Sequence, residues 1–409
     1  MAIGCDKSSA LFVLHRLRDA GHVAFFAGGC VRDMLLSTEP KDYDIATDAT
    51  PEQVEALFRR VLMVGAKFGV AMVIHHRQHI EVATFRTDAS YTDGRRPDGV
   101  TFSSPREDAL RRDFTINGMF YDPDEEKVID YVDGQIDLKA GLIRTIGTPA
   151  ERFGEDYLRL LRAVRFATRL SFTLDEATRK AVIQFAPQIN TISGERIFDE
   201  IENMLAKPTA LASLELLAKL DLAKEVLPAQ LLEDQAWTAA LKRVAMASEH
   251  DDSMLCFLAL LGDLPVADTN RLLRRWGASN HFRDLLRLVR EHRDSWATFL
   301  SWPTLAERKR LLARPGYSTL RALWEIRERC QTGRHATCDA IDGFVATLDP
   351  AQISPPPLLT GAMAMDRFDL VESPELGKLL RTLYTLQLEI EPADLDTLLT
   401  AASEQGLLP

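Results

Sequence analysis

Strand-forming patterns stop near residue 147 of this 409-residue chain, and helical patterns occupy almost everything after it. Up to that point, short runs rich in β-branched and aromatic residues alternate with helical segments. The predicted strands are residues 23–26, 42–46, 70–74, 80–85 and 142–146. Beyond Pro149, apolar residues recur at helical spacing over residues 157–170, 210–222 and 254–261. We therefore expect an α+β N-terminal unit with a small mixed β-sheet, followed by an all-α remainder.

Helix start and stop signals subdivide the chain further. Thr50, Pro51 and Gln53 form a pattern typical of a capping box, which predicts a helix that continues through Phe58. The proline run at residues 355–357 is the best candidate for a linker, because prolines at this density end helices. A chain of this length usually exceeds what one hydrophobic core serves, so about two to four structural units are expected.

The composition is that of an ordinary globular protein, with 46% hydrophobic and 27% charged residues. No apolar run approaches the length that a membrane-spanning helix needs, so no membrane association is expected. The five cysteines show no paired spacing typical of a secreted disulfide framework, which indicates a reducing compartment. We therefore predict a cytoplasmic protein.

The net charge of −11 argues at first against a nucleic-acid partner, because Lys and Arg contacts to phosphates supply much of the binding energy. The distribution of charge matters more than its sum. Arginines gather at Arg159, Arg162 and Arg165, and again between residues 271 and 293. Such groups can form basic stripes on an acidic protein. Solvated helix faces explain the second group equally well.

The most informative segment is residues 25–47, in which a strand leads into two glycines, a short helix and a second strand with two aspartates. Gly28 and Gly29 let the backbone approach a ligand closely, and a helix that starts beside them offers free N–H groups to a triphosphate. Asp42 and Asp44 alternate with Tyr43 and an isoleucine, so both carboxylates are expected on one face of the strand.

A third carboxylate, Glu81, lies between two apolar residues on a separate predicted strand. Three carboxylates on neighbouring strands repel one another unless cations lie between them, and this arrangement is typical of a two-metal site. An Asp-x-Asp pair by itself is more often a turn or a solvated strand face. The glycine turn nearby favours the metal interpretation.

Five segments follow one another in an order shared with a known family. They are GGCVRDMLL with DYDIAT, FRTDASYTDGRRPDGVTF, LRRDFTINGMFYD, VDGQIDLKAGLIRTIG and ERFGEDYLRLLRAVRFATRL. This series resembles the signature of class II CCA-adding enzymes and bacterial poly(A) polymerases, and it covers most of residues 23–206. The resemblance implies a template-independent RNA nucleotidyltransferase.

The resemblance also implies roles for individual residues. Asp42 and Asp44 are implied to bind Mg²⁺, whereas a catalytic role for Glu81 carries over only from the wider nucleotidyltransferase superfamily. The residues implied to contact or border the incoming nucleotide are Gly28, Gly29, Arg32, Arg112, Asp113 and Asn117. The segment at residues 90–100 resembles the flexible loop that helps to switch base choice, with Gly94, Arg95, Arg96 and Gly99. A plain surface loop is the alternative.

Base selection is implied for the EDxxR element formed by Glu155, Asp156 and Arg159, on a predicted helix that also bears Arg162 and Arg165. Residues three apart share a helix face. Cytosine and adenine both present an amine for a carboxylate beside a ring nitrogen for a guanidinium, and uracil and guanine present the reverse. Asp156 and Arg159 are therefore expected to select C and A, while Arg162 and Arg165 hold phosphate or stack on a ring. A solvated i, i+3 ion pair is the alternative.

We therefore expect a nucleotidyltransferase head at residues 1–147, a helical neck at 148–230, a helical body at 231–354 and an RNA-binding helical tail at 355–409. The expected reaction adds CMP and AMP from CTP and ATP to the 3′ end of tRNA, with Mg²⁺ as cofactor and no DNA partner. Within the family, the alternatives are a poly(A) polymerase that acts on other RNA 3′ ends and an enzyme that adds only A.

Two departures from the family pattern limit what carries over. The segment MDRFDLVESPELG stands where many relatives have a glycine- and proline-rich turn, so the RNA contacts of that turn are not carried over. Leu261, Gly262 and Asp263 lack the histidine of an HD hydrolase domain, so no such activity is expected. A retired enzyme that only binds RNA is disfavoured by the retained carboxylates and arginines. A small-molecule nucleotidyltransferase needs neither the EDxxR element nor the long helical tail.

Overall fold

A computed structural model describes residues 6–88, 100–206, 208–250 and 252–409. The chain forms two compact units. The first comprises Met1–Asp234 and Ala267–Gly277, and the second comprises Gln235–Val266 and Ala278–Pro409. Among the described helices, none is both long enough and apolar enough to cross a bilayer.

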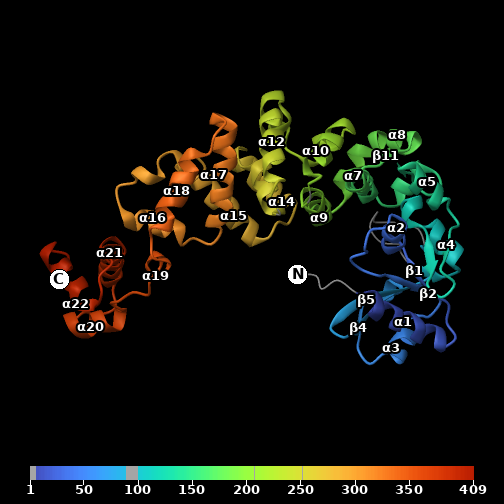
Figure 1. The fold of residues 1–409 in the computed structure, drawn as a ribbon, viewed down its shortest axis with the longest axis horizontal. Helices are drawn as coiled ribbons and strands as arrows, with labels where there is room; N and C mark the ends of the chain where they lie inside the picture. The colour runs from blue at the N-terminus through green and yellow to red at the C-terminus, as the bar shows by residue number, and fades with distance from the viewer. Residues whose placement is uncertain (1–5, 89–99, 207, 251) are drawn as a thin grey trace. The chain divides into compact units, whose positions relative to one another are not determined.

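A seven-stranded mixed sheet lies in the N-terminal part of the first unit (Figure 1). The strand order is β3-β4-β5-β2-β1-β8-β9, in which β2 and β5 run parallel and all other neighbours run antiparallel. Outside this sheet, β6 pairs with β7 antiparallel and β10 with β11 parallel. The strands are β1 (Ala24–Ala27), β2 (Ile45–Thr47), β3 (Val61–Gly65), β4 (Val70–His75), β5 (Gln78–Thr84), β6 (Arg86–Asp88), β7 (Val100–Phe102), β8 (Phe120–Asp122), β9 (Lys127–Ile129), β10 (Leu142–Ile143) and β11 (Thr173–Leu174).

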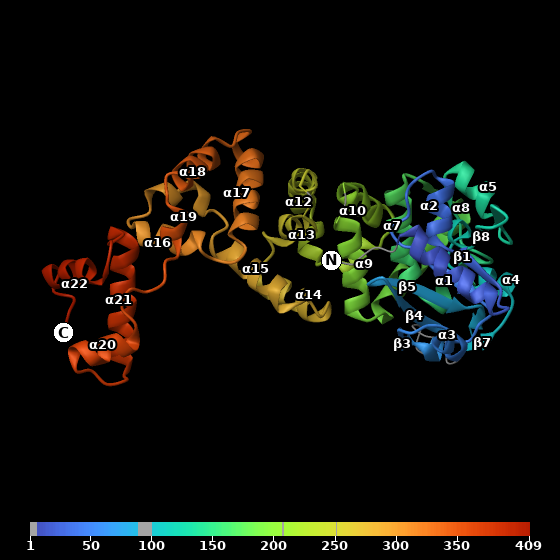
Figure 2. The same ribbon diagram turned by 60° about the horizontal axis from the view of Figure 1, so that its bottom comes forward.

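Helices α1 and α3 pack on this sheet and on each other, α1 against β1, β2 and β5 and α3 against β3, β4 and β5 (Figures 1 and 2). The buried face of α1 includes Val13, Leu14 and Leu17, which recur at helical spacing. The helices of the first unit are α1 (Lys7–Asp19), α2 (Gly29–Leu35), α3 (Pro51–Leu57), α4 (Pro105–Leu110), α5 (Gly134–Ala140), α6 (Pro149–Glu155), α7 (Leu158–Leu170), α8 (Glu176–Phe185), α9 (Gly194–Leu205), α10 (Ala210–Lys219), α11 (Ala223–Val226) and α14 (Val266–Arg275).

The α+β unit and the helical remainder are both present as expected, and the capping box of α3 forms between Thr50 and Gln53. Three strand predictions are wrong. The strand expected at residues 142–146 ends at Ile143, and within that range only an isolated bridge at Thr145 follows it. The strand expected at residues 42–46 begins only at Ile45, because pairing with β1 starts at the Phe26–Ile45 pair. A strand also occurs after Pro149, since β11 pairs with β10 over two residues. A strand of two residues is too short to show the alternation of apolar and polar residues from which strands are predicted.

The second unit is helical throughout its described residues. Its helices are α12 (Asp234–Ala247), which begins at the junction of the two units, α13 (Ser253–Leu261), α15 (Asn280–Glu291), α16 (Leu305–Leu312), α17 (Tyr317–Thr332), α18 (Ala336–Ala346), α19 (Pro350–Ile353), α20 (Gly361–Phe368), α21 (Pro374–Ile390) and α22 (Leu395–Glu404). Helices α20, α21 and α22 share a hydrophobic core that includes Leu376, Leu383 and Leu398. Helix α16 packs on α21, where the buried Lys309 Nζ donates to the Leu388 carbonyl oxygen at 2.9 Å.

Within the first unit, the start of α9 lies directly against the end of α14. A Cβ atom on Gly194 would lie 1.5 Å from the Arg275 carbonyl oxygen, so no side chain fits at this position. The rings of Phe198 and Trp276 pack across the same contact with their centroids 5.6 Å apart. The glycine therefore fixes how closely the two helices approach each other.

We expect Gly194→Ala to lower the thermal midpoint of unfolding, because the added methyl group forces α9 and α14 apart. Overpacking of this kind costs about 1 to 3 kcal/mol. Gly154→Ala is the matched control, since a Cβ atom there meets nothing within 4 Å and alanine favours the helix. Differential scanning calorimetry compares the two variants. Equal midpoints would contradict the packing role of Gly194.

Candidate active site

A cavity of about 560 Å³ opens beside the sheet of the first unit. The described residues that the sequence assigned to the site all line it, with the exceptions of Asp42 and Glu155. The described lining carries nine arginines against four carboxylates, in a chain whose net charge is −11. This concentration of guanidinium groups favours an anionic ligand. The arginines are Arg32, Arg86, Arg111, Arg112, Arg159, Arg162, Arg165, Arg169 and Arg196.

Asp44 and Glu81 are brought together by the parallel pairing of β2 with β5. Ile45 pairs with Val82, and the two acidic residues each precede this pair by one position. Burial raises the pKa of Asp44 to about 7, with further increases from Glu81 and Asp42 and an opposing effect of Arg112. Loss of contact with water also raises the pKa of Glu81, although Arg112 and Arg86 act in the opposite direction. The two carboxylates therefore repel each other.

Asp42 occupies a different position from the one expected. It is exposed, it precedes the strand, and it is absent from the cavity lining. Tyr43 between the two aspartates is buried and packs on Phe26 with ring centroids 5.3 Å apart. Across the described residues, no three His, Cys, Asp or Glu side chains converge closely enough to hold a metal ion by themselves. The protein thus supplies a carboxylate pair with Asp42 nearby, and oxygen donors of this kind suit Mg²⁺ or Ca²⁺.

The glycine turn lets β1 enter α2 at the edge of the cavity. Gly28 has a φ of +73°, which side chains rarely tolerate, and a Cβ atom there would lie 2.9 Å from Arg112 Nη1. The Gly28 N–H donates to the Met119 carbonyl oxygen at 3.2 Å. Gly28 and Gly29 both line the cavity, so backbone rather than side chains forms this part of its wall.

Arg32, Asn117 and Asp113 form one buried network. Arg32 donates to Asn117 Oδ1 at 2.7 Å and to Asp33 Oδ1 at 2.8 and 2.6 Å. The Asn117 amide donates to Asp113 Oδ1 at 3.3 Å. Burial alone would raise the pKa of Asp113, but the charge and hydrogen bonds of Arg162 hold it down, to about 2. Asp113 thus stays ionised and fixes the orientation of Arg162.

Arg112 is oriented by a residue that the sequence analysis did not single out. Asp108 Oδ2 accepts from Arg112 Nε at 3.1 Å and from Nη2 at 3.0 Å, while Arg112 also lies 5.2 Å from the centre of the Phe120 ring. Asp108 is buried, with its other oxygen bonded to Arg111. The i, i+4 spacing of Asp108 and Arg112 is the signal that could have indicated this pair.

The EDxxR element differs from the expected continuous helix. Glu155 ends α6, Asp156 has an extended backbone, and Arg159 lies on α7. Asp156 receives two hydrogen bonds from Arg196 instead of pairing with Arg159, at 3.2 and 2.7 Å. Arg159 is buried, donates to the Arg152 carbonyl oxygen at 2.7 Å and forms an ion pair with Glu155. The prediction of one helix through Asp156 and Arg159 is therefore wrong.

Phe166 on α7 is a second residue that the sequence analysis missed. Three guanidinium groups lie over its ring, at 4.4 Å for Arg165, 5.2 Å for Arg162 and 5.4 Å for Arg32. Arg165 also donates to Glu200 on α9 at 2.7 Å. The ring holds these cations close together by cation–π attraction. The predicted base-switching loop, with Gly94, Arg95, Arg96 and Gly99, lies outside the described residues.

Comparison with known proteins agrees with this geometry. Residues 24–144 match the family described as "Poly A polymerase head domain", and residues 171–232 match "Probable RNA and SrmB- binding site of polymerase A". The chain is 39% identical over 280 residues to the CCA-adding enzyme of Limosilactobacillus reuteri, which covers 68% of each chain. It is 35% identical over 378 residues to the CCA-adding enzyme of Lactococcus lactis, which covers 90% of each chain.

Solved structures give the same result for the fold. The crystal structure of the Bacillus stearothermophilus CCA-adding enzyme in complex with CTP matches with a TM-score of 0.75 and 27% identity, over 98% of each chain. The Thermotoga maritima CCA-adding enzyme complexed with tRNA has the same fold, with a TM-score of 0.64 and 19% identity over 98% of this chain and 96% of that one. The chain therefore belongs to the family of CCA-adding enzymes, which are RNA nucleotidyltransferases with a poly(A) polymerase head domain.

Proposed function

We propose that this protein completes the 3′ end of tRNA by adding CMP and AMP from CTP and ATP, without a nucleic-acid template. The observation that carries the proposal is that one cavity is lined by the Asp44 and Glu81 carboxylates, by nine arginines and by the Asp156 carboxylate. A carboxylate pair suits metal-assisted phosphoryl chemistry, arginines suit a triphosphate, and a further carboxylate suits the amine of a base. The named relatives are CCA-adding enzymes, and one of them was solved with CTP.

Nucleotidyltransferases of this family use divalent metal ions, and we propose Mg²⁺ held by Asp42 and Asp44, with Glu81 beside them. Mg²⁺ is usually bound by one or two carboxylates and completes its shell with water and substrate phosphates. This habit fits a site that offers a carboxylate pair opposite an anion-binding wall. When bound, the metal lowers the pKa of the attacking hydroxyl and offsets negative charge on the transferring phosphate.

The side chains of the chain position the reacting groups. The RNA 3′-hydroxyl gives up its proton to solvent and attacks the α-phosphate in line. The new phosphodiester bond forms as the bond between the α-phosphorus and the bridging oxygen to the β-phosphate breaks, and pyrophosphate leaves. Arg32 and Arg112 contact the incoming nucleotide, and they are held in place beforehand by Asn117 and Asp108. Donors fixed before substrate arrives stabilise developing charge without reorganising during the reaction. Asp113 and Asn117 border the ribose, and Arg162 and Arg165 hold phosphate or stack on the base.

Asp156 and Arg159 select the base in this proposal. Both line the cavity, and Asp156 offers a carboxylate to the exocyclic amine of cytosine or adenine. Arg159 donates to the neighbouring ring nitrogen when it exchanges its bond to Glu155 or to the Arg152 carbonyl for a bond to the base. Uracil and guanine would oppose a carbonyl oxygen to the Asp156 carboxylate, which is repulsive.

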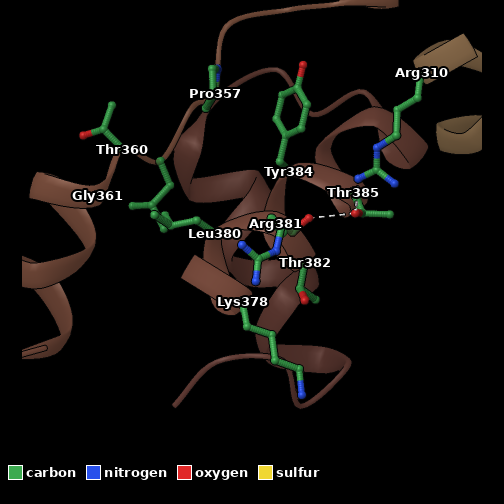
Figure 3. Close-up of a pocket in the computed structure, with 11 residues that line it drawn as sticks. Arg310, Pro357, Thr360, Gly361, Lys378, Leu380, Arg381, Thr382, Tyr384 and Thr385 are labelled. Carbon is green, nitrogen blue, oxygen red and sulfur yellow. Dashed lines mark hydrogen bonds between the residues drawn. The ribbon is translucent and has the colours of Figure 1, made fainter. Parts of the chain in front are cut away.

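A basic hollow in the second unit is our candidate for tRNA backbone binding by the tail. It has a volume of about 710 Å³ and is bordered by Arg310, Lys378 and Arg381, with no carboxylate among its described lining residues (Figure 3). By contrast, Arg287 and Arg293 between residues 271 and 293 form ion pairs with aspartates. Cations without carboxylate partners attract phosphates more strongly than neutralised ones do.

We place this activity in the cytoplasm. The four cysteines that the structure describes, Cys30, Cys256, Cys330 and Cys338, are all free thiols, as expected in a reducing compartment.

The product of the reaction tests the function directly. Transcripts of tRNA that end at the discriminator base, at -C and at -CC should each be completed to CCA and then released when CTP and ATP are supplied. Sequencing of the extended 3′ ends measures this. An enzyme that adds only A would extend the -CC transcript alone. Long adenosine tracts on unrelated RNA would identify a poly(A) polymerase instead.

The metal assignment predicts that Asp44→Asn reduces nucleotide incorporation by about 1,000-fold or more, since loss of a metal ligand removes several kcal/mol of transition-state stabilisation. Glu55→Gln on the exposed face of α3 is the control for loss of an acidic side chain. Removal of divalent ions with EDTA should stop the wild-type enzyme, and added Mg²⁺ should restore it.

The same Asp44→Asn variant should unfold no more easily than the wild type in metal-free buffer, because the neutral amide does not repel Glu81. Circular dichroism melts check this expectation. Appreciable turnover by a folded variant would refute the metal assignment.

The hollow on the tail predicts that Lys378→Glu with Arg381→Glu weakens tRNA binding by tenfold or more, roughly the effect of losing two phosphate contacts. The slope of log Kd against log salt should also fall by about 2, at close to 0.9 per phosphate. Arg314→Glu with Arg329→Glu carries the same charge change at two arginines of the second unit that already form ion pairs with carboxylates. If both double variants bind tRNA equally well across a salt series, the hollow is not an RNA-binding site.

A further inference from the structure

Asp156 is held by an arginine from α9, a helix that carries none of the residues to which the proposed function gives a role. Arg196 lies on α9, and its Nη1 and Nη2 donate to Asp156 Oδ1 and Oδ2 at 3.2 and 2.7 Å. We propose that Arg196 is a positioning residue for base selection, which leaves Asp156 one open acceptor position toward the base. The proposal rests on the function proposed above, because it concerns how the same cavity tells C and A from U and G.

The hydrogen bonds of Asp156 account for nearly all of its acceptor capacity. A carboxylate has about four lone-pair positions, two on each oxygen. Oδ1 accepts from Arg196 Nη1 and also from the Leu158 backbone N–H at 3.0 Å. Oδ2 accepts only from Arg196 Nη2 among the described groups. One position on Oδ2 is therefore open, and the side chain lines the cavity with 15% of its surface exposed.

A single open acceptor with a fixed direction is what selection of an amine requires. The amines of cytosine and adenine donate a hydrogen bond to it, whereas the carbonyl oxygens of uracil and guanine are repelled by it. A carboxylate that rotates freely can turn away and let a water molecule serve either kind of base. The planar guanidinium prevents this rotation, because it bonds both oxygens at once.

Arg196 is in turn fixed by the packing of its own helix. It lies two residues after Gly194, where α9 meets the Arg275 carbonyl oxygen so closely that no Cβ atom fits. The Phe198 and Trp276 rings pack at the same contact. The position of Arg196 is therefore set by the backbone of α14, not by the nucleotide. The Asp156 carboxylate therefore has its base-selecting orientation before the nucleotide binds.

Loss of Arg196 should spare the local fold. The Leu158 N–H still donates to Asp156, so this hydrogen bond at the start of α7 is kept. Among the described residues Arg196 forms no ion pair with Asp44 or Glu81. The acceptors that hold Arg32 and Arg112 are separate residues. The expected change is thus confined to base discrimination.

The test measures kcat/KM for CTP, UTP, ATP and GTP on tRNA acceptors with wild type, Arg196→Ala and Arg196→Lys. The ratios CTP/UTP and ATP/GTP should fall roughly tenfold in Arg196→Ala, as expected for one lost base-edge contact. Arg196→Lys should give intermediate ratios, because an ammonium group reaches one oxygen but cannot hold both. Arg314→Ala, which removes a half-exposed arginine paired with Glu291 in the second unit, should leave all four values unchanged.

A double-mutant cycle separates positioning from a structural role. If Arg196 acts through Asp156, the double variant with Asp156→Ala has the same ratios as Asp156→Ala alone. Equal losses of kcat/KM for all four nucleotides, unchanged ratios in a folded Arg196→Ala, or further losses in the double variant would each overturn the inference. If Arg196→Ala does not fold, the ratios of Arg196→Lys decide. A wild-type protein that adds neither CMP nor AMP to tRNA would instead overturn the proposed function, and the inference with it.

Discussion

The parallel pairing of β2 with β5 places the carboxylates of Asp44 and Glu81 side by side at the cavity, where they repel each other. The rest of the site depends on this repulsion. Strand β2 lies between β1 and β5, and β5 lies between β2 and β4, so neither strand can slip to separate Asp44 from Glu81. Register in a buried sheet is fixed, because a shift by one residue would turn every side chain to the other face. The repulsion must therefore be offset by positive charge. Arg112 supplies part of that charge, and it is itself anchored by Asp108.

In the arginine wall, like charges also lie close together and are also offset by charges of the opposite sign. Most of its guanidinium groups form ion pairs with carboxylates, as Arg162 does with Asp113. Some carboxylates serve two arginines, as Asp108 does with Arg111 and Arg112. Each partner fixes the direction of its arginine and limits the mutual repulsion of the cations. The wall keeps an excess of positive charge for an anionic ligand, and its donors are already oriented. The ion pairs thus fix the orientation of the arginines, and the excess of arginines over carboxylates attracts the anionic ligand.

Local patterns predicted much of the fold. The capping box at Thr50, the strands around Val70 and Ile80, and the long helical remainder all follow from spacing within a few residues. The break at Asp156 could not be predicted in this way, because EDYLRLL contains no glycine or proline to mark the end of a helix. The break is stabilised by a residue 40 positions away, Arg196.

The sequence predicted which residues belong to the site better than it predicted which of them contact each other. The glycine turn, the aspartates and the arginines could be assigned because their chemistry is specific. Which carboxylate holds which arginine depends on tertiary structure, so the partners Asp108, Glu200 and Arg196 were missed. The strand that was expected to carry Asp42 begins three residues later, and strand ends are set by pairing with neighbours rather than by the sequence of the strand itself.

The division of the chain into units has a consequence for its synthesis. The first unit is discontinuous: the chain leaves it at Asp234 and returns for Ala267–Gly277, after a stretch that belongs to the second unit. A growing chain delivers its N-terminal part first, so α9 emerges from the ribosome before α14 exists. Until residue 277 has been translated, the surface around Gly194 lacks the backbone that it was shaped to fit. The helix that carries Arg196 is therefore among the last parts of the first unit to reach its final place, and translation sets the time at which that happens.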